Sequence, residues 1–350
     1  MELKIKDIAK KAGVSPTAVS FALNGKEGIS EKTRQKILQI VEEEGYTSKS
    51  LMKKRLTSMD MNESSRLIFL LYPVNAQEEG EGSEDSYSFY EIMQKVEKQI
   101  REFKYNLFFK SIPMQGNYKK EIEKMIDFYQ VEGMIVVGTQ MSPAQIKNIY
   151  SIATPMVVID RFFQELNVDC VAFDNFAGAY EAVTYLIENH HRKIGYVGTG
   201  STNINLAERR EGYEAAMRDM KGLTDPRYCI SDIKNSEKEK WIELLGMPNE
   251  MPTAFLVESD YLAIDVIKEL QAAGFLVPQQ ISVIGFDNSV IANLVTPELT
   301  TMNLPWDKLA RLAVLRLMEK MRNGADGALK SKVSTELVER KSCRRISKDF

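Results

Sequence analysis

The sequence predicts a small all-α head followed by an α/β domain made of two parallel-sheet lobes. In the first 46 residues apolar residues recur at helical spacing, and from Arg66 onward short β-branched runs alternate with amphipathic helical patterns. Such alternation is typical of a parallel sheet with crossover helices. These units exceed one modest sheet, so two similar lobes are expected, with a cleft between them as the ligand site. The expected strands are Leu67–Leu71, Gly133–Val137, Met156–Ile159, Ile194–Val197, Ala254–Val257 and Ile281–Ile284.

The head is expected to begin with two short helices that meet at a tight turn. Gly13 can adopt the left-handed conformation that ends the first helix, and Ser15 can cap the second through its hydroxyl. Pro16 suits the first position of that second helix, which runs to Leu23. The pattern therefore predicts a helix-turn-helix. Its inward-facing residues are Ile5, Ile8, Ala9, Ala12, Val19, Ala22 and Leu23.

A third helix is expected to begin after Ser30 and to end at Gly45–Tyr46. The stretch that follows, 47–65, is polar and basic and has too little apolar content to form a core of its own. We therefore expect a head at 1–46 and a hinge and linker at 47–65. In the third helix Ile37, Ile40 and Val41 are expected to face the core, and Arg34 and Lys36 to remain outside.

Charge is distributed unevenly along the chain, whose formal net charge is −3. Residues 1–56 hold 12 Lys and Arg against 7 Asp and Glu, and the remainder holds 34 against 42. A basic head on an acidic body is the arrangement expected when only the head binds a polyanion such as DNA. No apolar run approaches the roughly 20 residues that a membrane span needs, and the first residues are charged, so a cytoplasmic protein without a membrane partner is expected.

The sequence lacks the residue patterns that metal sites, catalytic triads and dinucleotide-binding loops usually have. The three cysteines, Cys170, Cys229 and Cys343, are far apart, and His190 and His191 are adjacent, so their side chains diverge. Neither a metal site nor catalytic-triad chemistry is expected. The glycines between Gly195 and Gly200 do not complete a dinucleotide-binding loop, because position 203, where its third glycine would stand, is Asn203. We expect no cofactor and no enzyme activity.

An acidic, Gly- and Ser-rich stretch, Gln77–Ser86, precedes a helix expected to start near Phe89. It is too polar to be buried, so we expect a mobile loop. This loop is either a solvent-exposed insertion or a lid over the ligand, and the sequence leaves both alternatives open.

The second helix is expected to lie in the DNA major groove, which fits one α-helix. Its outer face carries Pro16, Thr17, Ser20 and Phe21, the predicted base-contact residues. Thr17 can hydrogen-bond one base edge, and Phe21 can press on a thymine methyl. Residues near helix ends suit phosphate contacts, although Ser15 and Ser30 equally suit simple capping. The predicted phosphate contacts are Ser15, Asn24, Ser30, Thr33 and Arg34.

Two segments, IKDIAKKAGVSPTAVSFALNG and ISEKTRQKILQIVEEEGY, resemble the head of the lactose/galactose (LacI/GalR) repressor family. The resemblance implies a three-helix head, a hinge helix that orders in the minor groove, and a regulatory domain shaped like periplasmic sugar-binding proteins. It also implies homodimers on near-palindromic operators. Two departures, Phe21 for the usual Arg and Ser48–Lys49 for the usual Pro-Asn, make operator preference unsafe to transfer.

In this family a hinge leucine from each subunit inserts between base pairs. Alignment from Tyr46 places Arg55 at that position. We therefore expect Leu56 to take this role, with Leu51 as the alternative, and Lys53 to contact the minor groove beside them.

The resemblance continues through the body, where VVIDRFF, RREGYEAAM, ISVIGFDNS and PELTTMNLP match family blocks in order. It implies that Asp160, Arg209 and Asp287 line an effector cleft, with Phe89 on the opposing lobe. Ser259 stands where the family often has Asn. The implied effector is a sugar or sugar derivative; alternatively, these charged residues are strand-end groups tied into salt bridges and caps.

The effector-binding and dimerisation domain is expected at 66–342, with a tail at 343–350. Its N-lobe is placed at about 66–161 plus 293–322 and its C-lobe at about 162–292 plus 323–342. The tail lacks the leucine heptads that join dimers into tetramers, so a dimer is expected. Two other classes stay open: a solute-binding receptor without a transcriptional role, and an enzyme that uses Asp160 and Asp287 as an acid/base pair. Both predict weak DNA binding.

Overall fold

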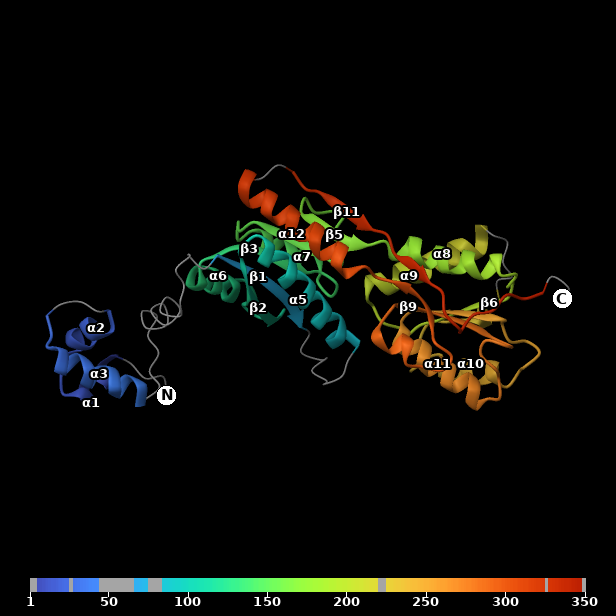
Figure 1. The fold of residues 1–350 in the computed structure, drawn as a ribbon, viewed down its shortest axis with the longest axis horizontal. Coiled ribbons are helices and arrows are strands. Elements are labelled where there is room, and N and C mark those ends of the chain that lie inside the picture. The colour runs from blue at the N-terminus through green and yellow to red at the C-terminus, as the bar shows by residue number, and fades with distance from the viewer. Residues whose placement is uncertain are drawn as a thin grey trace. The chain divides into compact units, whose positions relative to one another are not determined.

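The computed structural model describes residues 5–24, 28–43, 66–74, 84–219, 225–324 and 327–347. The chain divides into two compact units, Met1–Ser65, which contains the head, and Arg66–Phe350, the body (Figure 1). Within the described residues no helix combines the length and the apolar character that crossing a membrane would need.

The head packs three helices around one small core: α1 (Ile5–Ala12), α2 (Pro16–Asn24) and α3 (Glu31–Glu43). Gly13, at φ +68°, has the left-handed conformation that the sequence predicts after α1. The backbone N–H of Val14 donates to the carbonyl of Ala9 at 3.0 Å, at the C-terminal end of α1. The side chains of Ile5 and Leu23, both expected in the core, lie outside the described residues. The core is formed by Ile8, Ala9, Ala12, Val19, Ala22, Ile37 and Val41.

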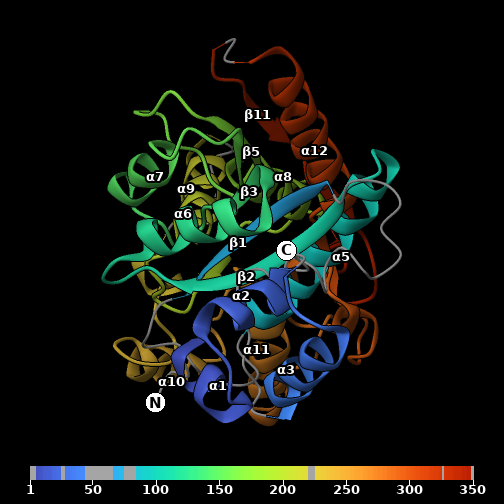
Figure 2. The ribbon, with the colours of Figure 1, turned by 90° about the vertical axis from the view of Figure 1, so that its left-hand side faces the viewer.

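The N-lobe is built on a parallel six-stranded sheet in the order β11-β5-β4-β3-β1-β2. Successive strand residues alternate between two cores, one under α5 and α12 and the other under α6 and α7, and Figure 2 shows these pairs on opposite sides of the sheet. The strands are β1 (Leu67–Val74), β2 (Asn106–Pro113), β3 (Val131–Val137), β4 (Met156–Ile159), β5 (Asp169–Phe173) and β11 (Lys330–Val333). The helices are α5 (Glu84–Glu102), α6 (Tyr118–Tyr129), α7 (Pro143–Tyr150) and α12 (Trp306–Asn323).

The C-lobe sheet has the order β12-β10-β9-β8-β6-β7 and is parallel except for β12, which runs antiparallel to β10. Helices α8 and α9 cover one face and α10 and α11 the other (Figure 1). The strands are β6 (Ile194–Val197), β7 (Cys229–Ile230), β8 (Ala254–Val257), β9 (Ser282–Asp287), β10 (Thr300–Asn303) and β12 (Glu336–Val338). The helices are α8 (Asn175–Glu188), α9 (Ile204–Asp219), α10 (Lys238–Leu245) and α11 (Asp260–Ala272), with short 3-10 turns η1 (Pro226–Tyr228) and η2 (Val290–Asn293).

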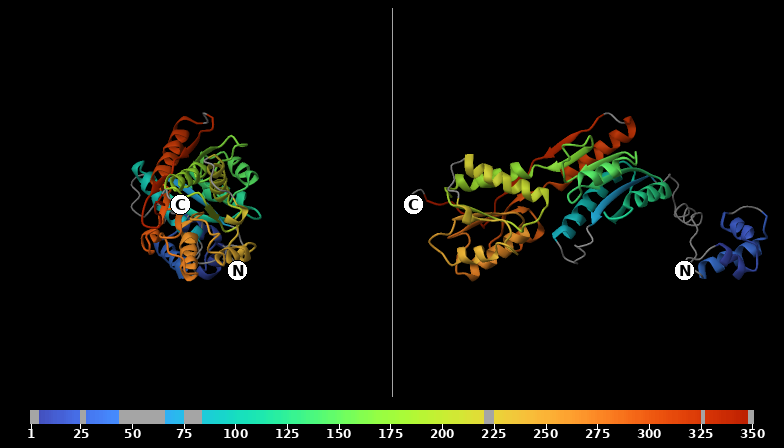
Figure 3. Two further views of the ribbon diagram at one scale, coloured as in Figure 1. Left: turned by 90° about the vertical axis from the view of Figure 1, so that its right-hand side faces the viewer. Right: turned by 180° about the vertical axis from the view of Figure 1, so that it is seen from behind.

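The chain passes between the two sheets three times: after β5, after β10, and between β11 and β12 (Figures 1 and 3). The lobe boundaries expected from the sequence are therefore wrong. β5 and β11 belong to the N-lobe sheet and β10 belongs to the C-lobe sheet, whereas the expected boundaries place each of them in the other lobe. The reason is physical, because strand partners are chosen over long sequence distances that local patterns do not encode.

Two further expectations need correction. Helix α5 begins at Glu84, so Glu84–Ser86 are helical and not part of a loop; positions 75–83 lie outside the described residues. The described residues of the expected tail, 343–347, also form part of the C-lobe. The ring of His191 is hydrogen-bonded to the carbonyl of Arg344 at 3.0 Å, and Ile346 donates to the carbonyl of Asn189 at 2.9 Å.

The buried His191 predicts a loss of stability in mild acid. Its ring contacts Thr253 Oγ1 at 2.9 Å as well as Arg344, and burial lowers the pKa of His191 from 6.5 to about 4. The unfolded chain therefore binds a proton that the folded chain refuses, so stability falls as pH drops from 6.5 to 4. The shift corresponds to about 3 kcal/mol. We expect the free energy of unfolding, measured with urea at several pH values, to fall by about this much more in the wild type than in His191→Gln. An equal fall of the unfolding free energy with pH in the two proteins would contradict the lowered pKa of His191.

Candidate functional site

The outer face of α2 is only partly open. Pro16 and Thr17 are exposed, whereas Ser20 and Phe21 are half-buried. The ring of Phe21 lies over Gly28, where an added Cβ would come within 3.0 Å of it. Phe21 therefore packs on the turn that leads to α3, and Thr17 is the more accessible of the two residues expected to read bases.

The hydroxyls near the helix ends cap helices. Ser15 Oγ accepts from the backbone N–H of Ala18 at 3.1 Å, and Ser30 Oγ accepts from that of Thr33 at 3.2 Å. The hydroxyls of Ser30 and Thr33 are also hydrogen-bonded at 2.8 Å. Capping, which the sequence favoured equally for Ser15 and Ser30, is thus present; phosphate contact stays a prediction. The side chain of Asn24 lies outside the described residues.

Arg34 is tied into the head. Its Nη1 donates to the carbonyls of Phe21 and Ala22, at 3.2 and 3.3 Å, and its Nε lies 3.5 Å from Glu31 Oε2. A guanidinium at the carbonyl end of α2 is favourable for the helix dipole. The side chain, 17% exposed, therefore holds α3 against α2. Sequence reasoning, which placed Arg34 on the outside, missed this inward role.

A cavity of about 110 Å³ lies between the two lobes, where the carboxyl ends of strands from both sheets meet. Asp160 follows β4, Asp287 ends β9, and Ser259 stands just before α11. Arg209 comes from the middle of α9. The four residues therefore line one cavity although they are widely separated along the chain. The effector-binding role that the family resemblance implies for them stays a prediction. The cavity is smaller than the roughly 300 Å³ at the lower end for drug-sized ligands.

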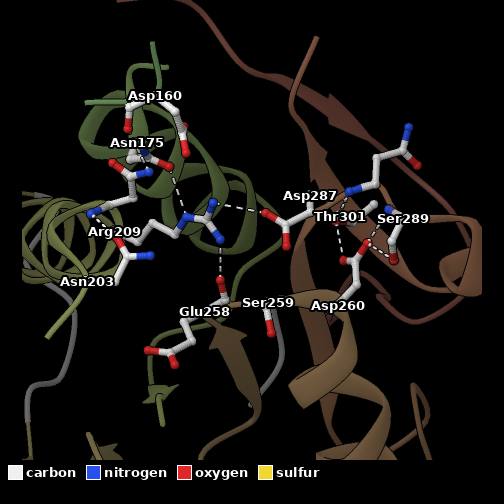
Figure 4. A network of polar contacts seen from close by, with 12 residues as sticks. Asp160, Asn175, Asn203, Arg209, Glu258, Ser259, Asp260, Asp287, Ser289 and Thr301 are labelled. Atoms are coloured by element: carbon white, nitrogen blue, oxygen red, sulfur yellow. Dashed lines mark hydrogen bonds and ion pairs between the residues drawn. The ribbon is translucent and has the colours of Figure 1, made fainter. Parts of the chain in front are cut away.

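Arg209 is the centre of the polar network drawn in Figure 4. Its Nε donates to Asn175 Oδ1 at 2.9 Å, its Nη1 to the carbonyl of Glu258 at 2.5 Å, and its Nη2 lies 2.9 Å from Asp287 Oδ1. The guanidinium also lies over the ring of Phe286, 3.9 Å from its centroid. These contacts fix the orientation of the guanidinium before any ligand binds.

Asp160 lines the cavity from the N-lobe, directly after β4. Thr139 Oγ1 donates to its carboxylate at 2.6 Å, and Asn205 of the C-lobe donates to its carbonyl at 3.1 Å. Burial raises the pKa of Asp160 to about 6, although the Thr139 hydrogen bond and the charge of Arg209 lower it. Its φ of +64° is uncommon for a non-glycine residue. Such a conformation persists only where surrounding contacts fix it.

The carboxylates of Asp287 and Asp260 lie close together at the end of β9. Burial raises the pKa of Asp287, against the opposing charge of Arg209. Behind it, burial and the charge of Asp287 raise the pKa of Asp260 to about 7. Asp260 accepts hydrogen bonds from the hydroxyls of Thr301 and Ser289, at 2.5 and 2.9 Å. The region is therefore rich in acceptors, and Arg209 pairs with one of its carboxylates, that of Asp287.

Ser259 has a structural contact as well as its place at the cavity. Its hydroxyl accepts from the backbone N–H of Leu262 at 3.3 Å and so caps α11. The side chain of Phe89, expected on the opposing lobe, lies outside the described residues, as do Leu51, Lys53 and Leu56 of the hinge.

Sequence reasoning missed several lining residues. Trp306, which opens α12, lines the N-lobe side and packs edge-on against Phe173, with ring centroids 4.7 Å apart. It is one of two tryptophans and directly follows the PELTTMNLP block, which was the available signal. The others missed include Tyr72, Thr139, Gln140, Asn203 and Asn205. Among the described residues no group of three His, Cys, Asp or Glu side chains could hold a metal ion.

Comparisons with known proteins agree with both parts of the structure. The family model "Bacterial regulatory proteins, lacI family" matches residues 4–49, and that for a "Periplasmic binding protein-like domain" matches residues 183–343. The ribose operon repressor of Haemophilus influenzae is 30% identical over 325 residues, which cover 91% of this chain and 92% of the relative. The transcriptional repressor CytR of Escherichia coli is 30% identical over 346 residues, covering 98% and 96%.

Solved structures share the fold. A Lac repressor dimer bound to operator and the anti-inducer ONPF has a TM-score of 0.67 at 19% identity, covering 98% of this chain and 100% of that one. A complex of the regulator CelR with cellobiose has a TM-score of 0.66 at 20% identity, covering 97% and 99%. With a helix-turn-helix head, a two-lobed body and relatives matched over nearly their full length, the chain belongs to the LacI family of bacterial regulatory proteins.

Proposed function

We propose that this chain is a transcriptional repressor whose affinity for operator DNA is set by a small polar molecule bound between the lobes. The observation that carries the proposal is the cavity lined by Asp160, Arg209 and Asp287 in the same chain as a helix-turn-helix head. Relatives named as ribose operon repressor and CytR support it. We place the protein in the cytoplasm, as a homodimer and without enzymatic activity.

The charge of the cavity defines the class of ligand. Among its described lining residues two carboxylates, Asp160 and Asp287, face one guanidinium, that of Arg209. Arg209 is already paired with Asp287, so a phosphate or carboxylate on the ligand would meet net negative charge. Hydroxyl or amine donors would instead satisfy the carboxylates. The ligand is therefore small, rich in donors and not anionic, which fits an unphosphorylated sugar or sugar derivative.

In the proposed complex α2 lies in the major groove, with Thr17 as the principal base contact and Pro16, Ser20 and Phe21 beside it. Ser15, Asn24, Ser30, Thr33 and Arg34 contact phosphates, and the hinge residues Leu51, Lys53 and Leu56 contact the minor groove. Arg34 donates to carbonyls at the end of α2, so its larger contribution is to hold α2 in its orientation against α3. A dimer would bind a near-palindromic site with one head on each half.

Selection of bound duplexes from a random library tests the proposal. We expect the full chain to enrich a near-palindromic sequence, with an affinity that falls steeply as salt rises, because phosphate contacts release counterions. Thr17→Ala should weaken binding to the selected duplex by about 10-fold, in the range of one lost base contact. Lys32→Ala, also exposed in the head but on α3, serves as the comparison. No enrichment over random competitor at moderate salt would leave the solute-binding receptor as the better interpretation.

A further inference from the structure

Three residues from different elements meet at the point where the linker joins the body. Arg66, the first described residue after the linker, precedes β1; Tyr105 lies in the turn between α5 and β2; Glu132 lies near the start of β3. We name these three residues the anchor cluster. They lie in the N-lobe, at the ends of the strands opposite to the cavity.

The anchor cluster is closed by mutual contacts. The guanidinium of Arg66 stacks over the Tyr105 ring, 4.1 Å from its centroid, and also donates to the Tyr105 hydroxyl. That hydroxyl donates to Glu132 Oε2 at 2.8 Å, and Arg66 Nε lies 3.6 Å from the same oxygen. The backbone is held as well, because Asn106 N–H donates to the carbonyl of Arg66 at 2.9 Å.

The exposure of its side chains indicates that the anchor cluster orients Arg66 and contributes little to the stability of the fold. Tyr105 is 4% exposed, whereas the side chains of Arg66 and Glu132 are 48% and 42% exposed. An ion pair this exposed contributes little to folding. A planar guanidinium stacked on a fixed ring has a defined orientation, however, so these contacts hold Arg66 in place at the start of β1.

Two adjacent strands connect the anchor cluster with the cavity. β1 starts next to Arg66, ends at Val74, and carries Tyr72 and Pro73, which line the cavity, near that end. β3 pairs with β1 in parallel, carries Glu132 near its start, and ends at Val137, another lining residue. These packed strands therefore form a continuous connection between the cavity and the anchor cluster, and packed elements move as units because they do not deform continuously.

We propose that Arg66, Tyr105 and Glu132 are the positioning residues through which the state of the cavity reaches the linker and, through it, the DNA-binding head. This inference rests on the proposed function. It assigns a specific task to residues that touch neither ligand nor DNA. It also predicts that breaking the cluster uncouples the two sites while each remains intact.

A double-mutant cycle on the full chain tests the inference without a known ligand. Asp287→Asn alters the cavity by weakening the pairing with Arg209, and Glu132→Gln removes the charge that pairs with Arg66 in the anchor cluster. Fluorescence anisotropy would give the dissociation constant for the duplex selected by the wild type. We expect Asp287→Asn to change that constant at least about 5-fold in the wild-type background, as typical allosteric coupling does. In the Glu132→Gln background the change should shrink to less than about 2-fold.

Glu97→Gln is the matched control. Glu97 is 43% exposed and accepts from Arg101 Nη2 at 2.6 Å within α5, and this ion pair includes no residue of the anchor cluster. It should leave the full effect of Asp287→Asn in place. Arg66→Lys, which keeps the charge and loses the planar stacking, should behave as Glu132→Gln does. Asp160→Asn would replace Asp287→Asn if that variant failed to fold.

The outcomes separate the two proposals. If the cavity variants change operator affinity equally in the wild-type and Glu132→Gln backgrounds, the anchor cluster is merely structural and the inference is overturned while the proposed function stands. If the cavity variants change nothing even in the wild type, the coupling in the proposed function fails, and the inference fails with it.

Discussion

Arg209→Ala is expected to abolish the ligand response while the protein still binds its operator. Its operator dissociation constant should change about as in Asp287→Asn, because both variants break the pair between Arg209 and Asp287. The guanidinium is buried, compensates Asp287 and holds Asn175, so its removal leaves carboxylate charge unopposed in the cavity. Each lost charge-assisted hydrogen bond contributes about 1.5–3 kcal/mol, and two of them correspond to at least about a hundred-fold loss of ligand affinity. Because the head folds around its own core, DNA binding by the ligand-free protein should persist.

Thermal shift with ribose and cellobiose, followed by operator binding with any compound that stabilises the wild type, would measure the effect. Arg210→Ala is the matched control, because Arg210 is next in sequence, is exposed, and pairs with Glu214 along α9 at 2.9 Å. Ribose 5-phosphate should not stabilise the wild type. A retained response in Arg209→Ala would refute its role, and preferential binding of the phosphate would refute the ligand class.

Asp169→Ala is expected to destabilise the body by about 3–5 kcal/mol, the cost of leaving buried charges without their partner. Asp169 is fully buried at the start of β5 and accepts from Arg316 Nε at 2.7 Å, from Lys320, and from the Leu329 N–H at 2.8 Å. The side chains of both cations are less than a tenth exposed. These hydrogen bonds and the charge of Lys320 hold the pKa of Asp169 below its usual value in spite of burial.

Urea unfolding monitored by circular dichroism would measure this loss. The comparison is Asp307→Ala, because Asp307 pairs with Lys95 at 2.8 Å on the exposed start of α12, where a salt bridge contributes up to about 1 kcal/mol. Similar losses of unfolding free energy in both variants would show that the buried ion pairs of Asp169 stabilise the body no more than an exposed salt bridge does. A much larger loss in Asp169→Ala would show that it fastens β5, α12 and the chain before β11 together.

Local physics explains what the sequence could predict. Helix ends in the head depend on adjacent residues, so the left-handed Gly13 and the capping Ser15 could be predicted from type and position. Fully buried strands such as β4 and β8 are short apolar runs and were predicted at their observed limits. The half-exposed edge strands β2 and β11 carry polar residues and lack that signal, so they were not predicted.

The cavity shows the same division. Asp160, Arg209 and Asp287 stand in blocks that resemble a known family, and the structure places them at one cavity. Trp306 and Asn205 reach it only because the chain crosses between the lobes and α9 turns its first residues toward β4. The internal pairing of Arg209 with Asp287 depends on the same packing, and spacing along the sequence could not reveal it.

The three passages of the chain between the sheets limit how this protein can be dissected. The C-lobe consists of residues from α8 to β10 together with a separate stretch from β12 onward, and the N-lobe likewise contains separate stretches. Neither lobe can be produced as one uninterrupted fragment, and a single proteolytic cut in one connection leaves two others in place. A half-molecule would need its missing strand supplied as a second polypeptide or joined by circular permutation.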